Sequence, residues 1–347
     1  MNLEEIFQSA TKAVHLAHES YHKILKENSG IDVRLTWLTK EEFSAFASKR
    51  NGDGNFEISI SEGVISFLFS AAEASFKSPN NKLVENAIQD IDGLSDMKSL
   101  PIEDEDYYIE RFVKITILWI YFHELAHIAQ DHNKIGSEIG CAVTGWDIPL
   151  EQVFVSSDGE DDSADGSLRH IFELSADSEA TTHVIYFLST TNMTKTVLKS
   201  DIWFLILGVT RLFASFYRGE FGKRKRVASG THPSADLRLR LIIMKTMIIC
   251  NDLQVTDQLV PWAQDRKSVF NVVKPAFISA TADLLYLYNT LDENEFLQLV
   301  FSFDNGLDTY ANTIFSRYTE IHPILIKSYK GLSTEGILKI GTAYMLG

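Results

Sequence analysis

Residues 115–132 of the chain read ITILWIYFHELAHIAQDH. Apolar residues fill this stretch at helical spacing, so the sequence predicts a buried helix over about residues 107–132. His123 and His127 are four residues apart and therefore lie one above the other on one face of that helix. Two imidazoles on one rigid element can bind one metal ion, and HELAH fits the HExxH pattern of zinc hydrolases. Glu124 lies at the edge of the same face, where its carboxylate can take a proton from water.

A chance occurrence of this pattern is the alternative to a metal site. An HExxH string arises by chance in roughly one chain in a hundred of ordinary composition. Here the flanking residues are apolar, and two histidines and a glutamate inside a buried helix are costly unless a partner pairs them. We therefore favour a metal site, with an internal polar network that binds no metal as the alternative.

Composition excludes several classes of protein. The chain has 347 residues, of which 45% are apolar and 23% charged, as in folded globular proteins. Its net charge of −15 argues against a nucleic-acid partner, because phosphate binding needs clustered Lys and Arg. Cys141 and Cys250 form no disulfide framework. No secretory signal is visible, and no apolar run approaches the roughly 18–20 residues of a membrane span. We expect a soluble cytoplasmic protein, and the sequence leaves its oligomeric state open.

The N-terminal part predicts a helix followed by a small β element. Residues 2–27 are amphipathic, residues 31–38 alternate like a strand, and Phe56, Ile58 and Ile60 alternate with polar residues in a second strand. Ser61 can cap a helix that runs through residues 64–76. A strand at this position could offer its edge to an extended peptide substrate, or it could simply cover the core.

Four other histidines have simpler explanations than metal binding. His15, His18 and His22 share one face of the first helix, which we interpret as a solvated or packed face. His132 follows His127 by five residues and lacks the spacing and the Gly of the metzincin pattern. On a continuing helix, His132 would point away from the HExxH face, so we interpret it as a helix-end residue that interacts with the helix dipole.

Two loops between the expected helices are strongly charged. Residues 156–165 form an acidic loop that could act as a lid. A calcium site from residue 161 is disfavoured, because Phe172 stands where the loop needs Glu. Residues 223–226 read KRKR, which we interpret as a solvated turn.

A second amphipathic helix over about residues 168–188 supplies more metal-binding chemistry. Glu173 and Asp177 lie four residues apart on one face, in an ExxxD arrangement. There Glu173 would be the third metal ligand and Asp177 would accept a hydrogen bond from the outer nitrogen of a ligating histidine. His170, or Asp177 itself, remains an alternative third ligand because imidazole and carboxylate both suit zinc.

Together HELAH, ELSADSEA and Thr231-His232-Pro233 with Arg238 resemble the gluzincin metallopeptidases of the HtpX and CAAX-endopeptidase type. Those enzymes span membranes, and among soluble relatives the chain most resembles the phage-exclusion Lit family. The motifs cover only about residues 107–240. The resemblance implies zinc on His123, His127 and Glu173, Glu124 as general base, Asp177 as the supporting carboxylate and His232 as a donor to the oxyanion.

We therefore expect a mainly helical α+β protein with a zincin-like fold and a small N-terminal sheet. Residues 1–250 would form the catalytic domain, and residues 251–347 a helical C-terminal region packed on the same core. The expected activity is a zinc-dependent endopeptidase that cuts a protein or peptide inside the cell. The alternative is a catalytically silent zincin-fold binding or regulatory protein, such as a phage-defence sensor.

Overall fold

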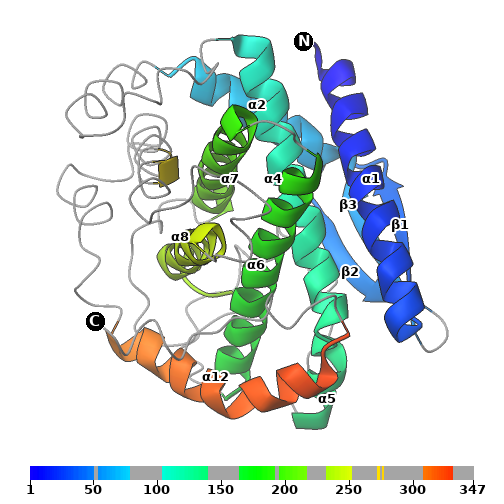
Figure 1. Ribbon diagram of the computed structural model, residues 1–347, viewed down its shortest axis with the longest axis vertical. Coiled ribbons are helices and arrows are strands. Elements are labelled where there is room, and N and C mark those ends of the chain that lie inside the picture. The colour runs from blue at the N-terminus through cyan, green and yellow to red at the C-terminus, as the bar shows by residue number, and fades with distance from the viewer. Residues whose placement is uncertain are drawn as a thin grey trace.

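The computed structural model describes residues 1–50, 54–78, 104–139, 164–191, 195–216, 232–251, 272–273, 276 and 308–330. Most of these residues are helical, and three short strands form one sheet near the N-terminus, so the predicted mainly helical α+β class is confirmed (Figure 1). In chain order the elements are α1 (Leu3–Ser29), β1 (Asp32–Leu38), β2 (Ala45–Lys49), β3 (Asn55–Ser61), α2 (Glu62–Phe76), α4 (Glu105–Ala129), α5 (His132–Ile139), α6 (Ala164–Thr191), α7 (Lys195–Phe216), α8 (Ala235–Asn251) and α12 (Asp308–Ser328).

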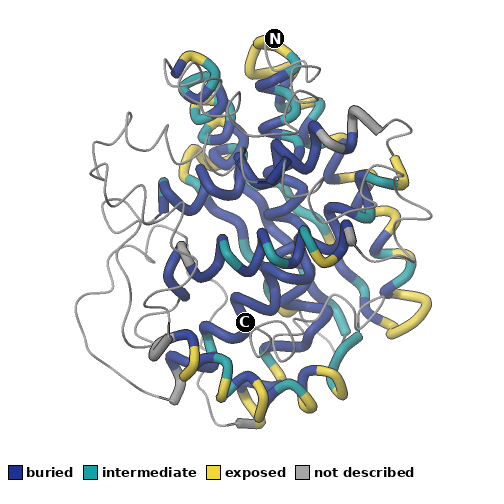
Figure 2. Tube along the Cα trace, turned by 60° about the vertical axis from the view of Figure 1, so that its left-hand side comes forward, coloured by how far each residue is buried: buried dark blue, intermediate teal, exposed yellow. Residues whose placement is uncertain are grey.

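The helix α4 lies at the centre of the fold and packs against α1, α2, α6 and α7. From Ile115 to His123 every residue of α4 is buried, and Figure 2 shows such burial through the middle of the molecule. Its N-cap is Asp104, whose side chain accepts a hydrogen bond from the Tyr107 N–H at 2.9 Å. It ends at Ala129, three residues before the predicted end.

The chain turns sharply after α4. Asp131 has a φ of 53°, in the left-handed region that few non-glycine residues adopt. The helix α5 then begins at His132 with a new direction. The predicted continuous helix through His132 is therefore wrong at its C-terminal end.

The sheet has the strand order β1-β3-β2, with β1 parallel and β2 antiparallel to β3. Its two outer strands differ in how well the sequence predicts them. The strand β1 follows the predicted alternation, whereas β2 reads AFASK, a short segment of mostly small residues that no sequence pattern predicts as a strand. β2 lies at an edge of the sheet and contacts α4.

Ser61 is the residue before α2, as predicted, but its side chain does not cap the helix. Its hydroxyl instead donates to the Glu42 carbonyl at 2.6 Å and accepts from the Ser44 N–H at 2.9 Å. The hydroxyl thus joins the segment before β2 to the end of β3, and this tertiary contact replaces the local cap.

The helices α6 and α7 cover one side of α4 and carry α8 packed on them, while α1 and the sheet cover the other side (Figure 1). α4 and α7 approach closely at Gly208, where an added Cβ would lie 1.9 Å from Thr116 Oγ1. The absence of a side chain at Gly208 therefore sets the distance between these two helices.

The helix α12 crosses one end of the molecule and packs on α5 and α6. Lys330, two residues after α12, fastens it to the end of α4: its N–H donates to the Ala129 carbonyl at 2.7 Å, and its Nζ lies 2.6 Å from Asp131 Oδ2. Ser29 at the end of α1 donates to the Lys330 carbonyl at 2.8 Å. The ends of α1, α4 and α12 thus meet at one point.

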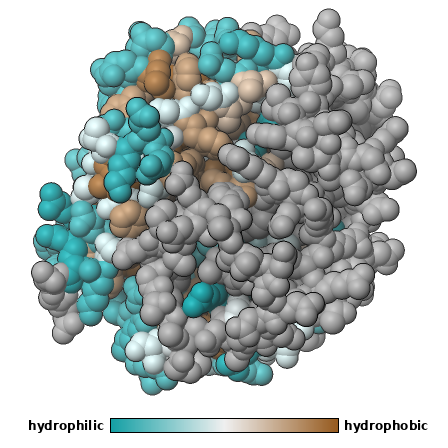
Figure 3. Space-filling model, turned by 180° about the vertical axis from the view of Figure 1, so that it is seen from behind, coloured by the Kyte–Doolittle hydropathy of each residue, from teal (hydrophilic) through white to brown (hydrophobic). Residues whose placement is uncertain are grey.

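Among the described helices, α4 is long and apolar enough to cross a membrane by composition alone, but 89% of its most apolar window is buried inside the protein. Such burial is what the core helix of a globular protein shows. The large apolar side chains with high exposure are scattered over α1, α8 and α12. On the face seen in Figure 3, apolar residues gather in the upper half and the rest of the described surface is largely polar.

Candidate metal centre

His123 and His127 face one another on the last two turns of α4. Their Nε2 atoms are 3.1 Å apart, and the two residues are 8% and 6% exposed. The spacing of four residues on a regular helix explains this arrangement, because it places both rings on one face. The helix therefore presents two nitrogen donors to one point.

Glu173 reaches the same point from α6. Its Oε2 lies 3.5 Å from His123 Nε2 and its Oε1 lies 3.5 Å from His127 Nε2. Within the part of the chain that the structure describes, these three residues form the one group with donor atoms all within 4.8 Å of one another. The rival ligands His170 and Asp177 do not belong to this group.

The distances between the donors test whether a metal ion fits. Tetrahedral coordination at about 2.0–2.1 Å, as zinc prefers, places neighbouring donors about 3.3–3.4 Å apart. The observed separations of 3.1, 3.5 and 3.5 Å bracket that value. Two imidazoles and one carboxylate also leave a fourth position for water or substrate. The group thus fits a small divalent cation in size, number and type of donor.

Asp177 supports His123 from behind. Its Oδ1 lies 3.0 Å from His123 Nδ1, the nitrogen that points away from the other donors. Arg238 of α8 holds this carboxylate with two hydrogen bonds, Nε to Oδ2 and Nη2 to Oδ1, both 2.7 Å. The guanidinium also lies 4.3 Å above the Phe213 ring. Asp177 is fully buried, so the fork of Arg238 compensates a charge that water cannot reach.

His232 lies at the same centre, three residues before α8 begins. Its Nε2 is 3.5 Å from Glu173 Oε2. Arg238 lies in the first turn of α8 and approaches the same carboxylate, with its Nη2 also 3.5 Å from Glu173 Oε2. Thr231, the first residue of the predicted motif, lies outside the described residues.

Glu124 sits beside the donors at the surface of the site and is partly exposed. Its carboxylate accepts a hydrogen bond from the backbone of Ala47 in β2. Desolvation raises the pKa of Glu124 to about 8, and the negative charge of Glu173 adds to that effect. A nearby cation would lower this pKa again, because it favours the carboxylate.

The charges of the group also suit a cation. Burial raises the pKa of the Glu173 carboxyl, but His232, His123 and His127 outweigh burial and hold that pKa well below its usual range. Burial lowers the pKa of His123, yet the contacts with Asp177 and Glu173 prevail and raise it to about 10. The carboxylates of Glu173 and Asp177 thus face one guanidinium, that of Arg238, which leaves an excess of negative charge. This excess favours protonated imidazoles, and a bound metal ion would supply the same positive charge.

His132 lies at the site, which corrects the expectation that it points away. The left-handed residue Asp131 ends α4 and turns the chain back, so that His132 Nδ1 lies 2.8 Å from His127 Nδ1. Its ring is fully buried and stacks on Phe172 at 4.3 Å, and burial lowers its pKa to about 3. His132 is therefore a neutral partner of His127, and it does not join the donor group. Its position depends on one backbone angle that the sequence pattern does not reveal.

The histidines of α1 make contacts within their own neighbourhood. His18 Nδ1 lies 3.2 Å from the Tyr121 hydroxyl, His22 Nε2 lies 3.1 Å from Asp32 Oδ1, and Trp37 donates to His15 Nε2 at 3.2 Å. These contacts agree with the interpretation as a packed helix face. The acidic loop up to residue 163 and the basic cluster at residues 223–226 lie outside the described residues.

The model of the family Peptidase U49 matches residues 95–253, just under half of the chain. This segment contains the donor group, Glu124, Asp177, His232 and Arg238. The predicted resemblance to a peptidase family is therefore confirmed, whereas the gluzincin class stays a prediction. No curated protein and no solved structure matches the chain at a significant level.

Proposed function

We propose that the chain is a zinc-dependent endopeptidase of the cytoplasm that cuts a protein or peptide. The observation that supports this most is the buried group of His123, His127 and Glu173, which has the donor types and separations of a tetrahedral zinc site. The match to a peptidase family over the same residues supports hydrolysis of peptide bonds.

His123, His127 and Glu173 would hold the ion. When bound, zinc supplies a Lewis acid that acidifies water and polarises a carbonyl group. Asp177 and Arg238 orient His123 for this task, because a carboxylate behind a ligating imidazole fixes the ring and raises its basicity.

Glu124 is the proposed general base. Its carboxylate would take a proton from the attacking water and pass it to the nitrogen of the leaving amine. A partly exposed carboxylate with a raised pKa is suited to both steps, because it accepts and returns a proton near neutral pH.

The strand β2 offers a place for an extended peptide. Ser44 and Arg50 bond to β3, so residues 45, 47 and 49 direct their backbone groups to the opposite edge. The hydrogen bond from Ala47 to Glu124 lies on this edge, which therefore faces the proposed general base. A substrate that adds to it as a further strand would pass directly beside Glu124.

His232 is the proposed donor to the oxyanion, since it stands 3.5 Å from Glu173 without belonging to the donor group. Loss of one such donor typically costs about 10²–10³ in kcat. We expect His232→Phe to lower kcat by that order while it changes KM much less. An unchanged kcat would remove His232 from this role.

The deciding experiment compares parent and Glu124→Gln in a metal-dependent digestion of a cell lysate, with mass spectrometry of new termini. The glutamine side chain can still accept the Ala47 hydrogen bond, and Glu124 does not belong to the donor group, so we expect the variant to bind zinc. Because an amide cannot take a proton from water, we expect it to produce no new termini. Equal cleavage by parent and variant would refute the role of Glu124. A parent that binds zinc and cuts nothing would instead support the silent binding protein, and a parent without zinc affinity would support an internal polar network.

A further inference from the structure

A chain of buried polar side chains runs from His127 away from the donor group. His127 Nδ1 lies 2.8 Å from His132 Nδ1, and His132 Nε2 lies 2.8 Å from Gln130 Oε1. Gln130 Nε2 donates to Glu179 Oε2 at 2.5 Å and to the Ser175 carbonyl at 3.2 Å. The chain thus connects a candidate metal ligand on α4 with a carboxylate on α6.

The chemistry of these groups fixes the direction of every hydrogen bond. The amide nitrogen of Gln130 must face its two acceptors, so its oxygen faces His132 and accepts from Nε2–H. Because His132 Nε2 donates to Gln130, the neutral form of this fully buried ring has no hydrogen on Nδ1, and that nitrogen accepts from His127 Nδ1 at 2.8 Å. His127 therefore carries its hydrogen on Nδ1, which leaves Nε2 bare and able to bind a metal ion.

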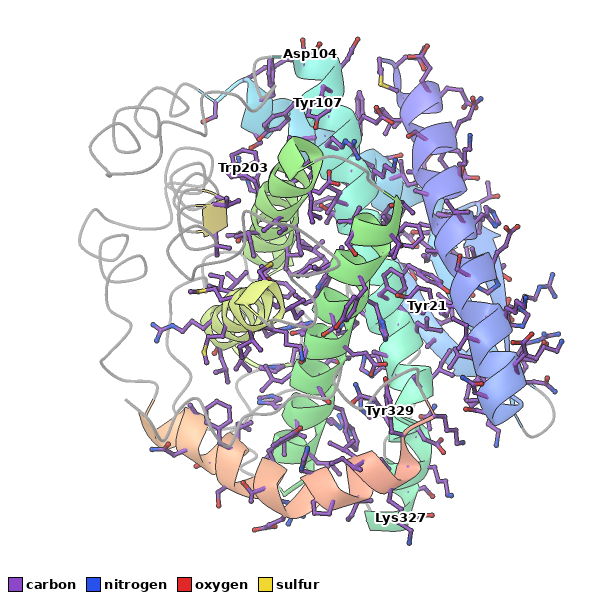
Figure 4. All side chains as sticks on the ribbon, viewed as in Figure 1. Tyr21, Asp104, Tyr107, Trp203, Lys327 and Tyr329 are labelled. Atoms are coloured by element: carbon purple, nitrogen blue, oxygen red, sulfur yellow. The ribbon has the colours of Figure 1, made fainter. Side chains whose placement is uncertain are left out.

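The carboxylate at the end of the chain is buried and fully engaged. Glu179 is 1% exposed, and Gln130 and His132 are not exposed at all. Glu179 Oε1 accepts from the Tyr329 hydroxyl at 2.7 Å and lies 3.1 Å from His183 Nε2. Figure 4 shows Tyr329 just past the end of α12, beside the lower part of α6. In such a low-dielectric site a chain of aligned bonds polarises toward its charged end.

The two imidazoles of the donor group thus receive different support from one helix. Asp177 stands directly behind His123, whereas Glu179 acts on His127 through Gln130 and His132. Both carboxylates belong to α6, which also supplies Glu173. The helix α6 therefore provides one metal donor, Glu173, and the carboxylates that support the other two donors, His123 and His127.

We propose that His132, Gln130 and Glu179 are positioning residues that hold His127 in its Nδ1–H tautomer with Nε2 turned toward the metal, and that Tyr329 makes the end of α12 part of this support. The inference rests on the proposed metal site. It assigns no contact with substrate to these residues.

The first test measures zinc affinity by competition with a chelator for the parent, Gln130→Met and Tyr329→Phe. Loss of an outer partner of a ligating histidine typically weakens metal binding about 10–100-fold. We expect that loss for Gln130→Met and a smaller one for Tyr329→Phe, which removes only one donor to Glu179. Thr182→Val is the matched control, because its buried hydroxyl donates to Ser178 within α6, outside the chain; we expect its affinity to stay within about twofold of the parent.

The second test uses the unaltered protein and does not depend on how variants fold. Long-range ¹H–¹⁵N spectra of the zinc-loaded protein report which ring nitrogen carries hydrogen, and contacts with Phe172 identify the His132 signals. We expect hydrogen on Nε2 of His132 and on Nδ1 of His127. Hydrogen on Nδ1 of His132 would reverse the chain and overturn the inference, since a role in packing alone requires neither tautomer.

The outcomes separate this inference from the proposed function. A parent that binds no zinc overturns both. A parent that binds zinc no more tightly than Gln130→Met overturns the positioning role and leaves the peptidase proposal intact.

Discussion

Glu173 brings the carboxylate donor to the candidate site from a different helix than the two imidazoles. Its oxygens stand 3.5 Å from both Nε2 atoms, and its charge is the part of the donor set that most favours a cation. We expect Glu173→Gln to weaken zinc binding more than the roughly 10–100-fold typical for loss of an outer partner. Chelator competition measures this, with Glu110→Gln on the far half of α4 as the control. Equal affinity for parent and Glu173→Gln would return His170 to consideration as the third ligand.

Arg238 has a structural task that can be separated from metal binding. It holds the fully buried Asp177 through two bonds of 2.7 Å. Removing one partner of a buried ion pair typically costs about 3–5 kcal/mol, because the remaining charge is left uncompensated. We expect Arg238→Met to lower the free energy of unfolding by that amount, measured by urea denaturation without metal.

Arg238→Lys is the informative companion. It keeps the charge but loses the planar fork that bonds both oxygens of Asp177, so its stability should fall between those of the parent and Arg238→Met. If both variants unfold at the urea concentration of the parent, the pair contributes nothing to stability.

At the scale of elements, the contact between α4 and α7 depends on Gly208. A Cβ there would lie 1.9 Å from Thr116 Oγ1 and 3.2 Å from Thr116 Cβ. Alanine gains about 1 kcal/mol over glycine in a helix interior, whereas overpacking typically costs about 1–3 kcal/mol. Because the neighbour is buried and bonded to the Phe112 carbonyl, we expect the cost to prevail and Gly208→Ala to destabilise the protein. Thermal unfolding measures this.

A second substitution tests whether the contact with Thr116 causes this loss of stability. Thr116→Ala removes Oγ1, the atom at 1.9 Å from the added Cβ, and leaves only Thr116 Cβ at 3.2 Å, so the double variant should be more stable than Gly208→Ala alone. A double variant that adds both losses would show that the two residues do not interact.

How far the sequence predicts these elements depends on whether their determinants are local. Helical periodicity predicts α4 and α6, and spacing by four places His123 with His127 and Glu173 with Asp177. The turn at Asp131 and the strand β2 have no such local pattern. His132 reaches His127 only through the positive φ of Asp131, and AFASK becomes a strand because β3 pairs with it. Sequence patterns therefore predict the three residues of the donor group, whereas they do not predict the hydrogen-bonded chain of His132, Gln130 and Glu179 behind His127.

At the scale of the whole molecule, the candidate site joins parts of the chain that are distant in sequence. α4 supplies the two histidines and α6 the carboxylates. His232 comes from the segment before α8, Arg238 from the first turn of α8, and Tyr329 from the segment after α12. A metal ion bound here would link α4 to α6 at the centre of the fold, where these helices pack most extensively. Metal binding and global stability should therefore be coupled.

Removal and return of zinc measures that coupling. A ligand that binds only the folded state stabilises it by about 2.7 kcal/mol at a free concentration one hundred times its Kd. We expect zinc at that excess to raise the free energy of unfolding of the chelator-treated parent by about this amount, and to slow amide hydrogen exchange in both α4 and α6. Glu173→Gln at the same zinc concentration should show little of either effect, because its donor set is incomplete. Protection confined to α4 would mean that the ion sits on the two histidines alone, and the convergence of the two helices would then not be what creates the site.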